Sequence, residues 1–196
     1  GPSEVEVIAD ESANPAFIAA DFLSQAEHGV DSQAMLVTAS ESIVKPVMQA
    51  IREQLDRLPR KEITEKSLSH SRLIVLKDKQ EVIDFTNLYA PEHLIIQTTD
   101  YADIAGQVEN AGSVFMGPYT PESAGDYASG TNHTLPTNGY AKAYSGVNLD
   151  SFIKKITFQE ITADGIRLLG GTIRTMAANE QLDAHKNAVT IRLNTL

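Results

Sequence analysis

The sequence predicts an α/β fold: an open, largely parallel sheet with helices on both faces, followed by a C-terminal arm that is mainly helical. Three observations predict this fold. Short β-branched runs alternate with helical stretches from the start of the chain to about residue 118. The strands are almost continuously apolar, which is typical of a sheet that is covered on both faces. Helices between successive strands imply right-handed parallel crossovers, so the arrangement is Rossmann-like.

Five strands and the helices between them follow from hydrophobic periodicity and from the residues that begin and end helices. Asn14 caps the first helix, Pro15 takes its first position, and Gly29 lies just past its end. Ser40 caps the second helix, and Pro46 lies near its first turn. The predicted strands cover residues 3–9, 34–37, 72–76, 93–97 and 113–116. The predicted helices cover residues 14–28, 40–55, 78–88 and 102–108.

The pattern changes at residues 119–137, which carry many hydroxyls, one Asp and one His but almost no large aliphatic side chains. Connections of this length without a hydrophobic pattern are usually disordered or functional, and this one is rich in ligand-type and turn residues. Further along the chain we expect a short strand over residues 156–161 and helices over residues 162–179 and 180–193.

The last ~45 residues have too little apolar surface to fold alone. We therefore divide the chain into an α/β domain of residues 1–147 and an arm of residues 148–196. The arm is expected to pack on its own domain or on a partner subunit.

Composition narrows the classes of function. The chain has 196 residues, of which 42% are hydrophobic and 21% charged, as in an ordinary globular protein. The net charge of −10 argues against nucleic-acid binding, because the Lys and Arg residues are scattered. No apolar run reaches the ~20 residues that span a bilayer, and no signal segment opens the chain, so we expect a cytoplasmic protein without membrane contact. Without cysteine, a bound metal must use imidazole, carboxylate or amide oxygen.

Two short segments combine side chains that can bind metals or transfer protons. Gln25 and His28 are three apart on a predicted helix, so they share a face and could bind one cation. The alternative is a histidine that interacts with the helix dipole. Glu92 and His93 place a carboxylate beside an imidazole, which suits proton transfer if both point into one cleft. Neighbours in a strand point to opposite faces, however, so Glu92 could instead be a solvated residue.

Asp126 lies in the first turn of a predicted helix that Thr120 caps and Pro121 opens. It either complements the helix dipole or binds a metal, since the glycines around it permit close approach of a ligand. In open α/β sheets, ligands bind at the carboxyl ends of strands. We therefore expect the site near Gly117 and Pro118 and the polar segment that follows, rather than near residues 90–93.

Taken together, these segments resemble the histidinol dehydrogenase family. The matching segments occur in the order expected for that family and run through the whole chain. They are Gly1-Pro-Ser-Glu-Val5, Leu23-Ser-Gln-Ala-Glu-His-Gly29, Tyr89-Ala-Pro-Glu-His-Leu94, Pro121-Glu-Ser-Ala-Gly-Asp-Tyr-Ala-Ser-Gly-Thr-Asn-His133, Leu135-Pro-Thr137 and Ala184-His-Lys-Asn-Ala188.

The resemblance implies a zinc-containing, NAD-dependent enzyme that oxidises L-histidinol to L-histidine in two hydride transfers, through a bound aldehyde. It implies that Gln25, His28 and Asp126 bind zinc, and that His185 completes the set from the other subunit of a domain-swapped homodimer. The zinc would also bind the substrate, so its task would be mainly orientation.

The resemblance also assigns the remaining site residues. His93 would remove protons during the oxidations, and Glu92 would activate the water that hydrates the aldehyde. Ser3, His133 and Glu180 would contact the substrate, together with the zinc ligands and the acid/base pair.

The chain departs from the family in length, since it is about half as long and starts where a separate nucleotide-binding domain would have ended. No glycine-rich dinucleotide fingerprint follows a strand. We therefore expect NAD to contact mostly the part that is missing, and the chain to be inactive alone. Two other functions remain open: a zinc-binding dimerisation module without catalysis, and a zinc hydrolase that uses Glu92 to activate water.

Overall fold

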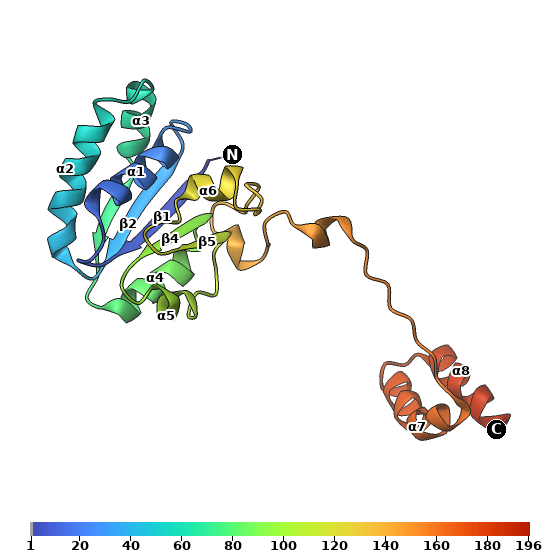
Figure 1. The fold of residues 1–196 in the computed structure, drawn as a ribbon. Helices are drawn as coiled ribbons and strands as arrows, with labels where there is room; N and C mark the ends of the chain where they lie inside the picture. The colour runs from blue at the N-terminus through green and yellow to red at the C-terminus, as the bar shows by residue number, and fades with distance from the viewer. Residues whose placement is uncertain (1) are drawn as a thin grey trace. The chain divides into compact units, whose positions relative to one another are not determined.

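Figure 1 shows the computed structural model, which describes residues 2–196. The chain divides into two compact units, Gly1–Ile153 and Lys154–Leu196. The sequence prediction drew this boundary a little earlier, between residues 147 and 148. Each unit is described by itself below.

The first unit is built on a five-stranded sheet in the order β3-β2-β1-β4-β5. All neighbouring strands are parallel, which confirms the predicted open α/β sheet. The strand order reverses between β1 and β4, so the sheet is doubly wound. The strands are β1 (Glu4–Ala9), β2 (Gln33–Thr38), β3 (Arg72–Val75), β4 (His93–Gln97) and β5 (Ser113–Met116).

Helices cover both faces of this sheet. In Figure 1, α1, α2 and α3 lie over one face, and α4 and α5 lie over the other. Short 3-10 turns complete the unit. The helices are α1 (Pro15–Ala26), η1 (Glu41–Ile43), α2 (Val44–Leu55), α3 (Lys61–Leu68), α4 (Lys79–Tyr89), α5 (Tyr101–Ala105), α6 (Glu122–Tyr127), η2 (Tyr140–Lys142) and η3 (Leu149–Phe152).

Two hydrophobic clusters hold the layers together. Val7 of β1 packs with Ile18 of α1 in the first cluster, and Ile8, the next residue of β1, packs with Ile83 of α4 in the second. Successive strand residues point to opposite faces, so β1, β2 and β4 each contribute buried residues to both clusters. Each fully buried aliphatic side chain contributes about 1.5–3 kcal/mol, which explains why nearly continuous apolar strands are needed here.

Two predicted helix starts are confirmed by their capping hydrogen bonds. Asn14 Oδ1 accepts the Ala16 N–H at 2.9 Å at the start of α1, and Asp78 Oδ1 accepts the Glu81 N–H at 3.0 Å at the start of α4. Ser40 is different: it precedes η1 and makes no capping bond, and α2 itself begins at Val44.

Three other local predictions were wrong or incomplete. The helix α3 was not predicted, because the residues it buries are Thr64 and Ser67, which give no apolar stripe. The helix α6 begins one residue later than expected, since Thr120 Oγ1 donates to Met116 O at 2.7 Å instead of capping the helix. Residues 156–161 form no strand. Phe158 there is 92% exposed, and a β-branched run without a neighbouring strand has nothing to pair with.

The second unit is a hairpin of two helices, α7 (Ala163–Asn179) and α8 (Asp183–Asn194). Thr162 caps α7, as its side chain accepts the Gly165 N–H at 3.1 Å. The hairpin buries Ala177 and Val189 but leaves large apolar side chains such as Leu168 and Met176 exposed. No helix within residues 2–196 combines the length and the apolar character needed to cross a membrane.

Candidate metal and acid–base site

The candidate site lies at the amino ends of β1 and β4, and not at the carboxyl ends as predicted. Glu92 and His93 open β4, and His93 is paired with Val5 near the start of β1. In a parallel crossover the helix runs back against the strands, so the C-terminal end of α1 reaches the same edge. It brings Gln25 and His28 there. The rule on carboxyl ends therefore does not describe Glu92 and His93, but the predicted polar segment does take part, because it contributes Glu122 and Asp126.

Glu92 and His93, the predicted acid–base pair, are held by the backbone of Glu4. Glu92 Oε2 accepts the Glu4 N–H at 2.8 Å, and His93 Nδ1 donates to Glu4 O at 3.0 Å. The two side chains also meet directly, with 3.5 Å between His93 Nδ1 and Glu92 Oε2. Glu92 precedes the first strand residue, so strand alternation does not separate it from His93. Both residues are about 5% exposed, and the alternative of a solvated Glu92 is therefore wrong.

The electrostatics of the pocket favour a proton on His93. Burial lowers the pKa of His93, but its hydrogen bond to Glu92 and the negative charges of Glu122 and Glu92 outweigh this effect, so the pKa is raised overall. With Nδ1 committed to Glu4 O, the second ring nitrogen, Nε2, is buried and has no partner among residues 2–196. An unsatisfied buried polar atom costs about 1–3 kcal/mol, which marks Nε2 as the point where a ligand would bond.

A group of metal-type ligands lies beside this pair. One ligand atom each from His28, Glu122 and Asp126 fall within 4.8 Å of one another. Glu122 and Asp126 are four apart on α6 and therefore share a helix face. Imidazole and carboxylate are ligands that zinc accepts, so the group is compatible with zinc.

Gln25 connects the two parts of the site. Its side chain is fully buried. In the amide orientation that satisfies both neighbours, Nε2 donates to the two carboxylate oxygens of Glu122 at 2.6 and 2.8 Å, and Oε1 accepts the Glu4 N–H at 3.2 Å. The Glu4 N–H is therefore shared between Gln25 and Glu92.

Glu122 is the most enclosed carboxyl of the metal-type group. Its pKa is raised to about 7, mainly by burial and also by the nearby charges of Asp126 and Glu92, against the opposing effect of His93. Several carboxyl groups in one enclosed space repel one another, so the arrangement favours a bound cation.

Sequence reasoning missed two residues of this site. Glu122 had a signal, because it lies four residues before Asp126 in a segment predicted to be helical. Glu4 had none, because its backbone N–H and C=O groups, rather than its side chain, hold Glu92 and His93.

The remaining predicted site residues are spread over both units. Ser3 directly precedes β1 and so lies at the same edge of the sheet, partly buried. His133 is exposed in the irregular segment after α6. Glu180 and His185 are exposed in the second unit, and their place in the site stays a prediction.

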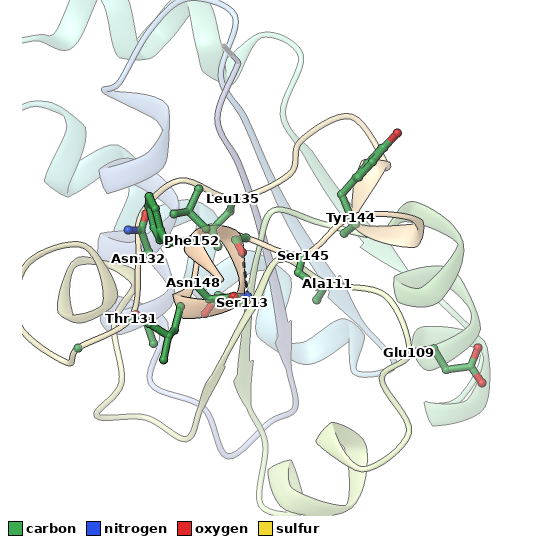
Figure 2. Close-up of a pocket in the computed structure, with 16 residues that line it drawn as sticks. Glu109, Ala111, Ser113, Thr131, Asn132, Leu135, Tyr144, Ser145, Asn148 and Phe152 are labelled. Carbon is green, nitrogen blue, oxygen red and sulfur yellow. Dashed lines mark hydrogen bonds between the residues drawn. The ribbon is translucent and has the colours of Figure 1, made fainter. Parts of the chain in front are cut away.

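A cavity of about 830 Å³ lies elsewhere in the first unit, between the start of β5 and the irregular segments on either side of η2. In Figure 2, Asn132, Leu135 and Phe152 lie together on one side of it, and Glu109 lies apart from them. None of the predicted site residues lines this cavity, so its size does not mark the chemistry.

The position of α6 depends on Gly125. A Cβ atom there would lie 2.6 Å from the Phe115 ring, too close for any real contact. We expect Gly125→Ala to lower the free energy of unfolding by about 1–3 kcal/mol through overpacking, and to weaken metal binding because α6 carries Asp126. Urea unfolding and zinc titration measure the two effects. Gly171→Ala, which meets nothing within 4 Å, is the control and should be neutral or stabilising.

Comparisons with known proteins identify the family. A family model described as histidinol dehydrogenase matches residues 1–193. The histidinol dehydrogenase of Bacteroides thetaiotaomicron is 68% identical over this whole chain, which covers 46% of that protein. The chloroplastic enzyme of Arabidopsis thaliana is 58% identical, with 42% of its length covered.

A crystal structure of histidinol dehydrogenase from Elizabethkingia anophelis, 57% identical, superposes with a TM-score of 0.95 over all of this chain and 45% of that one. The chain thus spans less than half the length of the relatives it matches. It belongs to the histidinol dehydrogenase family.

Proposed function

We propose that this chain is part of an enzyme that oxidises L-histidinol to L-histidine with NAD, through the aldehyde, in histidine biosynthesis. The observation that carries the proposal is the buried His93, whose Nε2 has no partner, next to a group of metal-type ligands. Membership of the histidinol dehydrogenase family supports the choice of this reaction.

His93 and Glu92 are proposed to move the protons. In each oxidation a hydride leaves the substrate carbon for NAD, and a proton leaves the attached hydroxyl group. His93 Nε2 would accept that proton. The other ring nitrogen, Nδ1, is hydrogen-bonded to Glu4 O, so Nε2 alone is free to face the substrate. Glu92 would take a proton from the water that adds to the aldehyde, which forms the hydrate for the second oxidation.

Gln25, His28 and Asp126 are proposed to hold zinc, with His185 supplied by a second subunit. A zinc ion there would supply a positive charge that binds and orients the substrate. The exposed apolar side chains of the α7–α8 hairpin support the proposal of a homodimer, because such surfaces are usually covered by a partner.

Substrate and cofactor contacts complete the proposal. Ser3, His133 and Glu180 are proposed to contact L-histidinol. NAD is proposed to contact mostly the part of the enzyme outside this chain, since no glycine-rich fingerprint occurs in the sequence. The isolated chain is therefore expected not to turn over.

The test is formation of NADH from L-histidinol with zinc present, by this chain alone and after mixing with a separately made N-terminal half of a close relative. We expect no activity alone and activity on mixing. Activity alone would place the NAD site within these 196 residues. If neither the chain alone nor the mixture forms NADH, the second candidate function, a zinc-binding dimerisation module, is favoured.

That second candidate is tested by zinc calorimetry and by mass measurement of the oligomer. A zinc site shared between subunits must lose affinity in His185→Ala. If zinc affinity does not change in this variant, His185 does not complete the site.

A further inference from the structure

Glu122 stands out among the residues near the proposed zinc ligands. It is 2% exposed and lies within reach of a cation held by His28 and Asp126, yet the ligand set implied by the family resemblance leaves it without a role. We propose that Glu122 is the second carboxylate of the metal site, where it balances the charge of a divalent cation and fixes the amide of Gln25. This inference rests on the proposed function, and it adds a positioning residue to the site.

Charge balance is the first argument. Gln25, His28 and His185 are neutral as ligands, so Asp126 alone would leave one unbalanced positive charge on a zinc ion. Uncompensated charge is costly at a buried position. The carboxylate of Glu122, within 4.8 Å of the ligand atoms of His28 and Asp126, makes the site neutral.

The contact between Glu122 and Gln25 is the second argument. The Gln25 amide atom that faces Glu122 lies 2.6 and 2.8 Å from the two carboxylate oxygens. A nitrogen at this position donates hydrogen bonds, which suits the site without metal. An amide oxygen at the same position could approach the carboxyl oxygens so closely only with a cation or a proton between them. The pair therefore suits the site both without and with metal. The Gln25 amide group rotates by half a turn when metal binds, which exchanges the positions of its nitrogen and its oxygen.

Turning the amide leaves no orphaned backbone donor. The Glu4 N–H would lose Gln25 Oε1 as an acceptor, but it keeps Glu92 Oε2 at 2.8 Å. The double contact at Glu4 thus keeps this N–H bonded when Gln25 changes partners. The carboxylate of Glu122 stays in place in both states, and it faces Gln25 Nε2 without metal and Gln25 Oε1 with metal bound.

The experiment is zinc calorimetry on this 196-residue chain and on three variants. Glu122→Gln keeps the shape but removes the charge, and we expect it to weaken zinc binding about 10–100-fold. His28→Ala should lose the site. Glu27→Gln is the matched control, because Glu27 lies between Gln25 and His28 in the sequence but outside the metal-type group, and its affinity should not change.

Thermal unfolding without metal separates this role from a structural one. Glu122→Gln should not lower the metal-free melting temperature, but it should reduce the rise that zinc produces. Unchanged zinc affinity in Glu122→Gln, with loss in His28→Ala, would overturn the role of Glu122 and leave the metal site standing. If the unaltered chain binds no zinc, or if His28→Ala binds zinc with the same affinity as the unaltered chain, the proposed metal site is wrong. The inference about Glu122 is then wrong too. Neither result depends on turnover, so the proposed reaction is tested separately.

Discussion

Replacing His93 by Asn is expected to lower kcat for L-histidinol oxidation by about 10²–10⁴-fold, the usual contribution of a general base. The Asn amide nitrogen lies close to the position of Nδ1 and can still donate to Glu4 O, so the local backbone should remain in place. Only the nitrogen corresponding to Nε2 is removed. The measurement is steady-state kinetics with L-histidinol and NAD, on the enzyme reconstituted from the two halves.

The split between kcat and KM decides what His93 does. A group that acts on the transferred proton lowers kcat with little change in KM, whereas a group that only binds substrate raises KM. His70→Gln is the control, because Gln can replace the contact of His70 Nε2 with Ser32 O away from the site. A kcat for His93→Asn equal to that of the control would remove His93 from the chemistry.

The sheet could be predicted closely because its signals are local. The strand β4 was predicted to the residue, as a five-residue segment with Leu94, Ile95 and Ile96 at its centre. The helix α3 could not be predicted, because Thr64 and Ser67 face the core and pack by hydrogen bonds. Ser67 Oγ, for example, donates to Ser32 O at 2.7 Å. A hydrophobic pattern does not record such contacts.

Part of the candidate site could be predicted from the sequence, but not its assembly. Spacing singled out Gln25 and His28, and adjacency singled out Glu92 and His93, but a structural alternative stayed open for each pair, and only the family resemblance assigned them roles. Which edge of the sheet they share depends on the direction of α1 against the strands, which is a property of the topology. The backbone of Glu4 holds Glu92 and His93, and every residue type except proline carries the same N–H and C=O groups, so composition gives no sign of this contact.

Glu6 carries the second large expected effect, on stability. Its side chain in β1 has no exposed surface, and it accepts a hydrogen bond from Thr86 Oγ1 on one oxygen only. Burial raises the pKa of Glu6 to about 8, although the Thr86 hydrogen bond opposes this. Below pH 4.5 the carboxyl is neutral in both the folded and unfolded chains. As the pH rises from there to about 8, only the unfolded chain releases the proton, so the free energy of unfolding falls.

Glu6→Gln removes this loss, because the amide is neutral at every pH and its oxygen can still accept from Thr86. We expect the variant to match the unaltered chain at about pH 4 and to exceed its free energy of unfolding by about 2–5 kcal/mol at pH 9. Urea unfolding at a series of pH values measures the difference.

The exposed carboxylate of Glu11 provides the control Glu11→Gln, whose difference from the unaltered chain should not grow with pH in this way. Burial also raises the pKa of Asp21, to about 7. Asp21 is present in both proteins, so its effect on the free energy of unfolding cancels when the two are compared. A difference that stays constant from pH 5 to 9 would show that Glu6 is ionised in the folded sheet, which would require water or a cation beside β1.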